Sequence, residues 1–223
     1  MQEQNFRVAT LVDGFNLYHS LEAAIEEGAH NSIKWLNIHA LCRSKLDMFN
    51  RKDILINKLC YFTSLANYRD VRVVNRHQAF IKALKITGFE IYFGEFKSKE
   101  VLCEARCRQK YIAHVEKRTD VNIAVKLLEL FHLDACDGCI ILSGDGDLIS
   151  AVVTARRLFP EKKVAILSPY KRNNRSLTGV ADCASMLEIK EYQNHRLSDQ
   201  VFDSEGLTYV KIPKEWKRPQ FSI

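Results

Sequence analysis

Four aspartates lie at points where the sequence changes from an apolar run or a polar loop to a helical pattern. Asp13 follows the first apolar run of the chain, and Asp120 opens an amphipathic segment. Asp145 and Asp147 flank a glycine directly after a later apolar run. Two unit charges about 4 Å apart repel each other by roughly 4 kcal/mol at an effective dielectric constant of about 20. A cluster of such residues therefore needs a shared proton or a divalent cation, and Mg²⁺ or Mn²⁺ suits a site with only oxygen ligands.

Each aspartate alone also has a purely structural explanation. Asp13 could form a turn with the glycine that follows it, Asp120 could cap a helix, and Asp145 with Asp147 could form a loop and a cap. Aspartates at the ends of two strands and at a helix start are together more than capping requires. We therefore favour a metal site for phosphoryl chemistry, in which the cation activates water and neutralises charge at the scissile phosphate.

The elements that must position these residues follow from an alternation of short β-branched runs and longer segments of helical period. This pattern is typical of a parallel sheet with helices on both faces. The predicted strands are 7–12, 54–62, 89–93, 138–143, 163–167 and 186–189. The predicted helices are 15–27, 38–49, 70–87, 120–131, 147–158 and 177–182. Ligands of such sheets bind beyond the carboxyl ends of the strands, where the strand order reverses, so we expect the aspartates at that edge.

Two segments depart from the alternation. The polar stretch from about residue 94 to residue 117 is interpreted as an excursion from the regular fold. Beyond Asn194 the pattern decays into a basic, proline-broken segment that contains Trp216. We predict one domain over residues 1–194 and a tail, residues 195–223, that packs on the domain or is partly mobile. An apolar helix face or the tail with Trp216 is available as the interface of a homodimer.

The composition of the 223 residues excludes several classes of protein. With 47% hydrophobic residues, 9 glycines and 4 prolines, the chain is neither collagenous nor intrinsically disordered. No apolar run approaches the roughly 20 residues that span a bilayer, and the first residues lack the layout of a signal peptide. We therefore expect a cytoplasmic protein with no membrane partner. The net charge of +6 is compatible with a polyanionic partner but does not require one.

Three segments of the chain resemble the motifs of a known family. They are residues 12–16 (VDGFN), 116–125 (EKRTDVNIAV) and 141–148 (ILSGDGDL). In this order and at this spacing they resemble the NYN domain family, in particular its LabA-like bacterial branch within the PIN-like nuclease superfamily. The resemblance extends from about Arg7 to Ile189.

The resemblance implies a three-layer α/β/α PIN-like (Rossmann-like) domain with a central, mostly parallel sheet, and a metal-dependent ribonuclease activity. Matched by position, the carboxylates around Mg²⁺ or Mn²⁺ would be those of Asp13, Asp120, Asp145 and Asp147. Asn16 would orient the first motif or a substrate group, and Ser143 would support the loop. Water would be the nucleophile that hydrolyses the RNA phosphodiester, without a covalent intermediate.

Basic residues near the same edge could follow the phosphate backbone of single-stranded or structured RNA. The candidates are Lys117, Arg118, Lys171, Arg172 and Arg175. The last three follow directly after a predicted strand, which favours them, although a solvated basic surface explains any one of them equally well. Glu104 and Glu116 are further acids whose place the sequence does not give, and no histidine has a partner that would make it catalytic.

The seven cysteines are an odd number in a chain without an export signal, so reduced thiols are expected. Four of them could hold a structural Zn²⁺ that pins the excursion to the core, namely Cys103, Cys107, Cys136 and Cys139. The sequence argues against this site, because Cys139 begins an apolar strand and the spacing of Cys103 and Cys107 is not the usual two-residue knuckle. The cysteines interpreted as core residues are Cys42, Cys60 and Cys183.

Two other classes of protein are compatible with parts of the pattern. A haloacid dehalogenase-like phosphatase also combines strand-end aspartates with a Gly-Asp loop and Mg²⁺, but it needs a second aspartate two residues after Asp13. Phe15 occupies that position. A non-catalytic module that keeps the fold and binds RNA or a protein partner is the alternative that stays open. The intact acidic set favours the enzyme, and we predict a Mg²⁺/Mn²⁺-dependent endoribonuclease.

Overall fold

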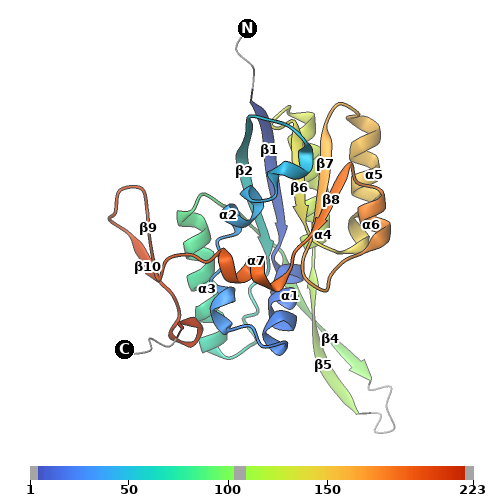
Figure 1. Cartoon of the computed structure of the whole chain (residues 1–223). Coiled ribbons are helices and arrows are strands. Elements are labelled where there is room, and N and C mark those ends of the chain that lie inside the picture. Colours follow the sequence, from blue (N-terminus) through green and yellow to red (C-terminus); the bar gives the residue numbers. More distant parts are fainter. Residues whose placement is uncertain (1–4, 103–108, 219–223) are drawn as a thin grey trace.

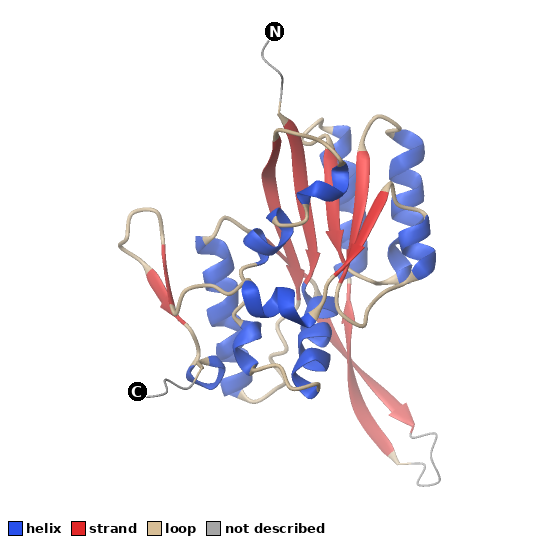
Figure 2. Cartoon of the chain, viewed as in Figure 1, coloured by secondary structure: helices blue, strands red, loops and turns tan. Residues whose placement is uncertain are grey.

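A six-stranded parallel sheet forms the centre of the computed structural model, which describes residues 5–102 and 109–218 (Figure 1, Figure 2). Every pair of neighbouring strands in this sheet is parallel. The strands are β1 (Phe6–Asp13), β2 (Ile54–Thr63), β3 (Glu90–Phe93), β6 (Gly138–Leu142), β7 (Lys163–Ser168) and β8 (Cys183–Met186). Their order across the sheet is β3-β2-β1-β6-β7-β8.

The strand order reverses between β1 and β6. From β1 the chain first adds β2 and β3 on one side and later adds β6, β7 and β8 on the other. Such a reversal leaves a crevice outside the carboxyl ends of the two central strands. Asp13 is the last residue of β1 and Asp145 lies in the loop after β6, so both stand at this switch point.

Helices cover both faces of the sheet. Along β1, Val8 and Val12 are fully buried on one face, and Ala9 and Leu11 are fully buried on the other. The first face packs against α1 (Gly14–Glu26), α2 (Ile38–Arg43), α3 (Val71–Ile86) and α7 (Ile189–Asn194). The second face packs against α4 (Thr119–His132), α5 (Ile149–Leu158) and α6 (Arg175–Gly179). This three-layer α/β/α arrangement confirms the predicted fold class. No described helix combines the length and the apolarity of a bilayer-spanning segment.

Capping residues of the sequence fix the ends of α3. The carboxylate of Asp70 accepts the backbone N–H of Arg72 at 2.8 Å, which satisfies one of the free donors at the helix start. Gly88 follows the helix with φ of 93°, a left-handed conformation that glycine adopts without steric strain. The predicted helix over residues 70–87 therefore matches α3 closely.

The helix predicted over residues 38–49 is wrong in its second half. The segment forms α2 and then a separate 3₁₀ turn, Leu46–Phe49. The hydroxyl of Ser44 donates to the carbonyl of Leu41 at 2.8 Å and so ends α2. Serine competes for backbone hydrogen bonds in this way, which an apolar periodicity alone does not reveal.

The last predicted strand, over residues 186–189, is displaced. The strand is β8, Cys183–Met186, and Ile189 instead begins α7. The reason is a capping box, in which the side chain of Glu191 accepts the backbone N–H of Glu188 at 2.7 Å. Two predicted helices are likewise shifted. The segment predicted over 147–158 forms a 3₁₀ turn, Gly146–Leu148, followed by α5, and the helix predicted over 177–182 is α6, which begins at Arg175.

The segment interpreted as an irregular excursion is a regular antiparallel ribbon. Its strands are β4 (Glu95–Leu102) and β5 (Lys110–Lys117), and Figure 1 shows them extending away from the main body. Ile112 is 67% exposed and Leu102 is 54% exposed. Because neither face of the ribbon enters the core, its sequence lacks the alternation of a half-buried strand.

The tail beyond residue 194 returns to the domain. It forms the short hairpin of β9 (Gln200–Phe202) and β10 (Tyr209–Lys211) and then a 3₁₀ turn, Lys214–Trp216. The ring of Trp216 lies 6.4 Å from that of Trp35 and 6.5 Å from that of Phe80, measured between centroids. Trp216 therefore packs on its own chain, beside α3.

A candidate metal centre at the carboxyl edge of the sheet

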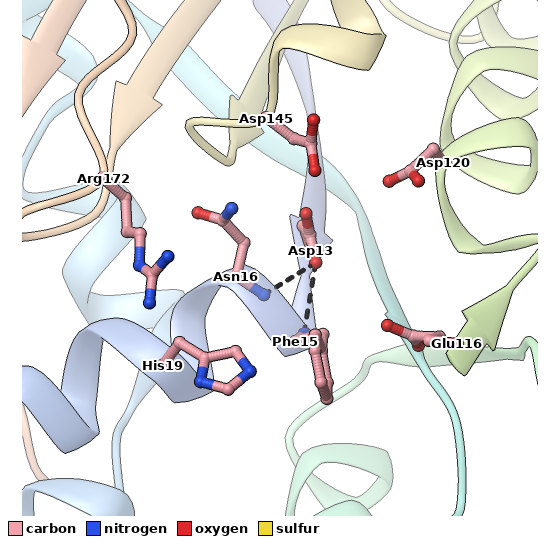
Figure 3. A pocket seen from close by; sticks show the side chains of 8 residues that line it. All are labelled: Asp13, Phe15, Asn16, His19, Glu116, Asp120, Asp145 and Arg172. Atoms are coloured by element: carbon pink, nitrogen blue, oxygen red, sulfur yellow. Dashed lines mark hydrogen bonds between the residues drawn. The ribbon is translucent and has the colours of Figure 1, made fainter. Parts of the chain in front are cut away.

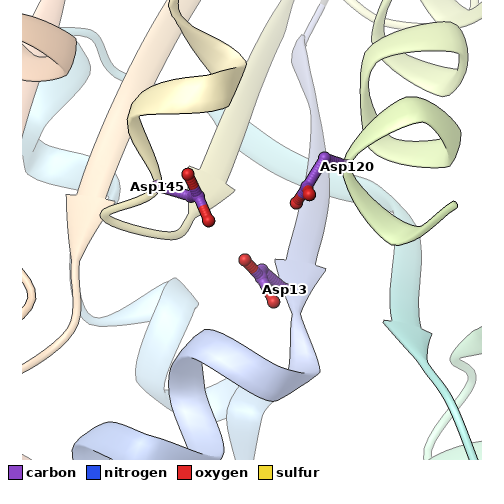
Figure 4. Close-up of side chains that lie close together, drawn as sticks. All are labelled: Asp13, Asp120 and Asp145. Carbon is purple, nitrogen blue, oxygen red and sulfur yellow. The ribbon is translucent and has the colours of Figure 1, made fainter. Parts of the chain in front are cut away.

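Three of the four predicted aspartates meet at the switch point. Carboxylate oxygens of Asp13, Asp120 and Asp145 lie within 4.8 Å of one another. They come from the end of β1, the first turn of α4 and the loop after β6, and Figure 4 shows the three side chains converging. Asp13 is only 3% exposed, whereas Asp120 and Asp145 are half-buried.

The carboxylate of Asp13 is held by neutral donors. One oxygen accepts the backbone N–H groups of Phe15 at 3.2 Å and Asn16 at 2.9 Å, so Asp13 caps α1. The other oxygen accepts the hydroxyl of Ser143 at 2.8 Å. Asp13 thus has both of the roles that its position allowed, because it caps a helix and also belongs to the cluster.

The charges of the cluster are poorly compensated by the protein itself. Burial raises the pKa of Asp13 to about 7, although the hydrogen bonds from Asn16 and Ser143 oppose the shift. Burial also raises the pKa of Asp120, and the nearby charges of Asp145 and Asp147 add to that effect. Three carboxylates with only oxygen donors and a raised affinity for positive charge are the ligand set that a hard divalent cation prefers. The residues therefore fit a divalent metal ion.

Two side chains join the start of α1 to the loop after β6. The hydroxyl of Ser143 accepts the backbone N–H of Asp145 at 3.1 Å while it donates to Asp13. The side-chain oxygen of Asn16 accepts the backbone N–H of Gly144 at 3.1 Å. These bonds fix the carboxylates of Asp13 and Asp145 relative to each other. Asn16 and Ser143 are the two residues for which the sequence predicts a supporting role.

Gly144 is required because another part of the backbone crosses at its α-carbon. A Cβ atom at this position would lie 1.4 Å from the carbonyl oxygen of Arg172 and 2.6 Å from its carbonyl carbon. Real Cβ atoms do not approach backbone atoms so closely. The absence of a side chain at Gly144 therefore lets the loop after β7 pass beside the loop after β6, and this crossing brings Arg172 to the site.

The cluster opens into a pocket of about 350 Å³, called here the acidic pocket (Figure 3). Its lining residues are Asp13, Phe15, Asn16, His19, Glu116, Asp120, Asp145 and Arg172. In Figure 3, Asp120 and Glu116 lie on one side of Asp13, and His19 and Arg172 lie on the other. A cation and an anionic group could therefore both be held in this pocket, between the carboxylates and the guanidinium.

Asp147 is not one of the three clustered aspartates. Its side chain is exposed, and its backbone N–H donates to the carboxylate of Asp145 at 3.0 Å. Asp145, and not Asp147, thus caps the turn that precedes α5. Asp120 is not the N-cap residue, because α4 begins at Thr119 and Arg118 occupies the N-cap position, with a left-handed φ of 78° and no side-chain capping bond.

The five basic candidates lie in different environments. Arg172 lines the acidic pocket. The guanidinium of Arg118 lies 3.2 Å from the carboxylate of Glu95, and the ammonium of Lys171 pairs with Glu27. Lys117 ends β5 and Arg175 begins α6, both with exposed side chains. Among these five residues, the structure brings Arg172 alone into the lining of the acidic pocket.

His19 and Glu116 line the acidic pocket although the sequence analysis did not place them there. Burial and the nearby Arg172 lower the pKa of His19, which favours its neutral imidazole. A carboxylate oxygen of Glu116 accepts the hydroxyl of Thr119 at 2.8 Å. The spacing of His19 could have indicated its place, because His19 follows Asn16 by three residues and the two therefore lie on the same face of α1. No local signal places Glu116, which comes from the end of the ribbon.

The cysteines of the proposed zinc set are only partly described. Cys136 and Cys139 are fully buried in the layer that packs against α4 and α5. Burial raises the pKa of Cys136 to about 11 and also raises that of Cys139 strongly, which disfavours thiolates. Cys103 and Cys107 lie outside the described residues, as does Glu104. Cys42 and Cys60 are buried core residues as expected, whereas Cys183, on the edge strand β8, is partly exposed.

Comparison with known proteins places this geometry in a wider context. A sequence model of the NYN domain family matches residues 7–187. The crystal structure of a protein of unknown function from Vibrio parahaemolyticus RIMD 2210633 is similar, with a TM-score of 0.56 and 19% identity. The alignment covers 88% of this chain and 100% of that chain, and at this identity it shows the fold. No curated protein is significantly similar to the chain in sequence.

Proposed function

The chain belongs to the NYN domain family, which is part of a nuclease superfamily, and we propose that it is a metal-dependent ribonuclease that hydrolyses RNA phosphodiester bonds. The observation that carries the proposal is the acidic cluster. Asp13, Asp120 and Asp145 come from three separate elements and converge within 4.8 Å. Helix capping explains Asp13 and Asp145 singly but does not explain their convergence with Asp120.

The three clustered carboxylates would hold Mg²⁺ or Mn²⁺, and Asp147 and Glu116 would supply further negative charge nearby. When bound, the cation would activate water and offset the charge at the scissile phosphate. The hydroxyl of Ser143 and the N–H groups at the start of α1 keep the carboxylate of Asp13 in one orientation. The protein thus presents its oxygen ligands in a fixed geometry.

The opposite wall of the acidic pocket would bind the substrate. Arg172 is placed to hold a phosphate oxygen, since a guanidinium matches two oxygens of one phosphate. His19, neutral near pH 7 because burial lowers its pKa, can donate a hydrogen bond to a substrate oxygen. The other exposed cations near this edge would follow the RNA backbone on either side, namely Lys117, Arg118, Lys171 and Arg175.

Cleavage of end-labelled RNA by the purified chain tests the proposal. Single-stranded and hairpin RNA are incubated with Mg²⁺, Mn²⁺ or EDTA, and the rates of wild type, Asp120→Asn and Asp145→Asn are compared. Loss of a ligand is expected to lower the metal-dependent rate by at least about 100-fold, since even removing an indirect partner of a metal ligand lowers activity by about 10-fold to 100-fold.

The matched control is Asp134→Asn, which removes a carboxylate at the opposite edge of the sheet and outside the acidic pocket. Its cleavage rate is expected to equal that of the wild type. Cleavage that survives in EDTA, or that is unchanged in Asp145→Asn, would refute the proposal. RNA binding by folded protein without any cleavage would instead favour a non-catalytic binding module.

A further inference from the structure

A second cavity of about 160 Å³ adjoins the acidic pocket, and we call it the aromatic pocket. Its walls come from α1, α3, the loop after β2, β4 and the tail. The aromatic side chains that face it include Tyr18, Tyr68, His77, Phe80, Phe96 and Trp216. Phe15 and His19 line both cavities, so the two are adjacent at the start of α1.

The rings between the two pockets form a connected and partly open surface. Tyr68 meets Phe96 at 5.3 Å between ring centroids, and Phe96 meets Phe15 at 6.1 Å. Phe15 is 39% exposed and Tyr68 is 42% exposed, although both are large apolar side chains. The ring of His114 stacks on Tyr68 at 3.6 Å between centroids, so a planar group could join this series at the ring surfaces that His114 leaves open.

Two of the polar side chains that line the aromatic pocket are those of Ser64 and His77. Ser64 is only 5% exposed, and its hydroxyl oxygen forms no hydrogen bond within the part of the chain that the structure describes. One ring nitrogen of His77 lies 3.2 Å from the hydroxyl of Thr63, and burial lowers the pKa of His77, so the neutral ring offers a donor and an acceptor. Buried polar groups without partners are unfavourable unless a ligand satisfies them. Aromatic walls with a few polar side chains fit a heteroaromatic ring.

Three cations line the aromatic pocket, and two of them are paired with carboxylates. These cations are Lys34, Arg69 and Arg76. Lys34 pairs with Glu22, and Arg76 lies 2.9 Å from Glu215, but no carboxylate of the described residues pairs with Arg69. The acidic pocket gathers carboxylates that suit a cation, whereas Arg69 in the wall of the aromatic pocket can attract negative charge. A molecule that has flat rings on an anionic backbone matches both features.

We infer that the aromatic pocket receives an unpaired base of the RNA chain whose phosphate lies at the acidic cluster. The inference rests on the proposed function and narrows its substrate. A base within a duplex is stacked on both faces and has its edge occupied by its partner, so it cannot enter. The substrate class is therefore RNA that is single-stranded, or locally unpaired, beside the bond that is cut.

The test measures binding, so that it does not depend on cleavage. A single-stranded oligoribonucleotide with 2-aminopurine at one position is titrated with full-length Asp145→Asn protein, and quenching of its fluorescence reports stacking on an aromatic ring. The affinity of the same oligomer with an abasic site at that position is measured by fluorescence anisotropy. Tyr68→Ala removes one ring, and Ala66→Leu fills the pocket from its half-exposed wall.

Tyr209→Ala is the matched control, because Tyr209 is 46% exposed on β10 and does not line the aromatic pocket. Stacking of one base on an aromatic ring predicts that Tyr68→Ala, Ala66→Leu and the abasic site each weaken binding by about 5-fold to 100-fold. The two pocket variants are also expected to abolish the quenching. Tyr209→Ala is expected to leave affinity and quenching unchanged.

Equal affinity of the normal and abasic oligomers, or full quenching in Ala66→Leu, would overturn the inference. The same result is expected if the pocket serves a peptide side chain or a second copy of the chain. If the wild type cleaves RNA but the pocket variants bind the oligomer as tightly as before, the inference alone is refuted. If binding depends on the base but the wild type cleaves no RNA, the proposed function alone is refuted. Absence of any RNA binding would refute both.

Discussion

The two ends of the central strands carry carboxylates in opposite electrostatic states. At the amino-terminal edge, the guanidinium of Arg7 on β1 contacts both carboxylate oxygens of Asp137, at 2.8 Å and 3.0 Å. Lys162, only 7% exposed, pairs there with Asp134. At the carboxyl edge of the same strands, Asp13 is surrounded by neutral donors and by other carboxylates.

The pKa values of the two edges diverge accordingly. The hydrogen bond from Arg7 is the largest cause that lowers the pKa of Asp137 to about 2. Burial without a cation raises the pKa of Asp13 to about 7. Both edges belong to one sheet and lie at the ends of the same two strands, so a carboxylate at a strand end does not by itself identify a cation site. Lack of compensating charge distinguishes the edge that is suited to bind a cation.

The largest expected effect is on the pH dependence of stability without metal. The pKa of Asp13 is 3.8 in an unfolded chain and about 7 when folded, so between these values the folded protein retains a proton that the unfolded chain has lost. The contribution of Asp13 to stability is therefore present at low pH and is lost as the pH rises toward and past 7. Asp13→Asn lacks this loss, so its free energy of unfolding relative to that of the wild type is expected to rise by about 2–4 kcal/mol as the pH increases from 4 to 8.

Urea denaturation of both proteins in EDTA at several pH values measures this difference. Titrating groups outside the acidic cluster are shared and cancel in the comparison. A difference between Asp13→Asn and wild type that does not change with pH would show that the Asp13 carboxylate is not desolvated as the structure indicates.

The opposite edge is expected to respond with the opposite sign. Asp137→Asn removes the partner of Arg7 and should destabilise the protein by about 2 kcal/mol near pH 7. The lowered pKa of Asp137 means that its contribution is present above pH 4 and is lost as the pH falls toward 2, so the deficit of the variant should shrink over that range. The same urea series measures it, and a deficit that persists at pH 2 would contradict the ion-pair explanation.

Added metal is expected to act on one edge only. Mg²⁺ or Mn²⁺ at ten times its Kd should stabilise the wild type by about 1.4 kcal/mol, because it binds the folded state. Thermal denaturation with and without the ion should show this gain in Asp134→Asn and not in Asp145→Asn. Equal gains in both variants would place the cation outside the acidic cluster.

The smallest expected effect concerns a single phosphate contact. Arg172→Gln should reduce the slope of log affinity against log salt concentration by about 0.7 for single-stranded RNA. The control is Arg157→Gln, an exposed arginine in the last turn of α5. Salt titrations of RNA binding compare the two variants. An unchanged slope in Arg172→Gln would remove this residue from the substrate wall.

Much of the fold could be predicted because apolar periodicity is a local property. The strand over residues 7–12 and the helix over residues 70–87 are both correct, since burial of one or both faces dictates the residue pattern. The errors lie where a polar side chain intervenes or where burial is absent. Ser44 ends a helix, Glu191 starts one, and the ribbon contributes no core face.

The candidate site was predictable only where its residues lie at the ends of regular elements. Asp13, Asp120 and Asp145 follow this rule, and the three segments that resemble the family motifs contain all three. Asp147 satisfies the same pattern, but the turn that Asp145 caps leaves its side chain exposed and outside the three-carboxylate cluster. The two-residue spacing of Asp145 and Asp147 does not show which of these two aspartates faces the switch point.

The sequence by itself determined most strands and helices of the central domain and the aspartates at their ends, because these depend on neighbouring residues. Tertiary structure alone decided which side chains share the site. The parallel register that pairs Val12 with Leu142 brings Asp13 to Ser143, 130 positions apart in the chain. The crossing at Gly144 likewise brings Arg172 to the acidic pocket. Such contacts depend on how strands pair and backbones cross, which no local pattern specifies.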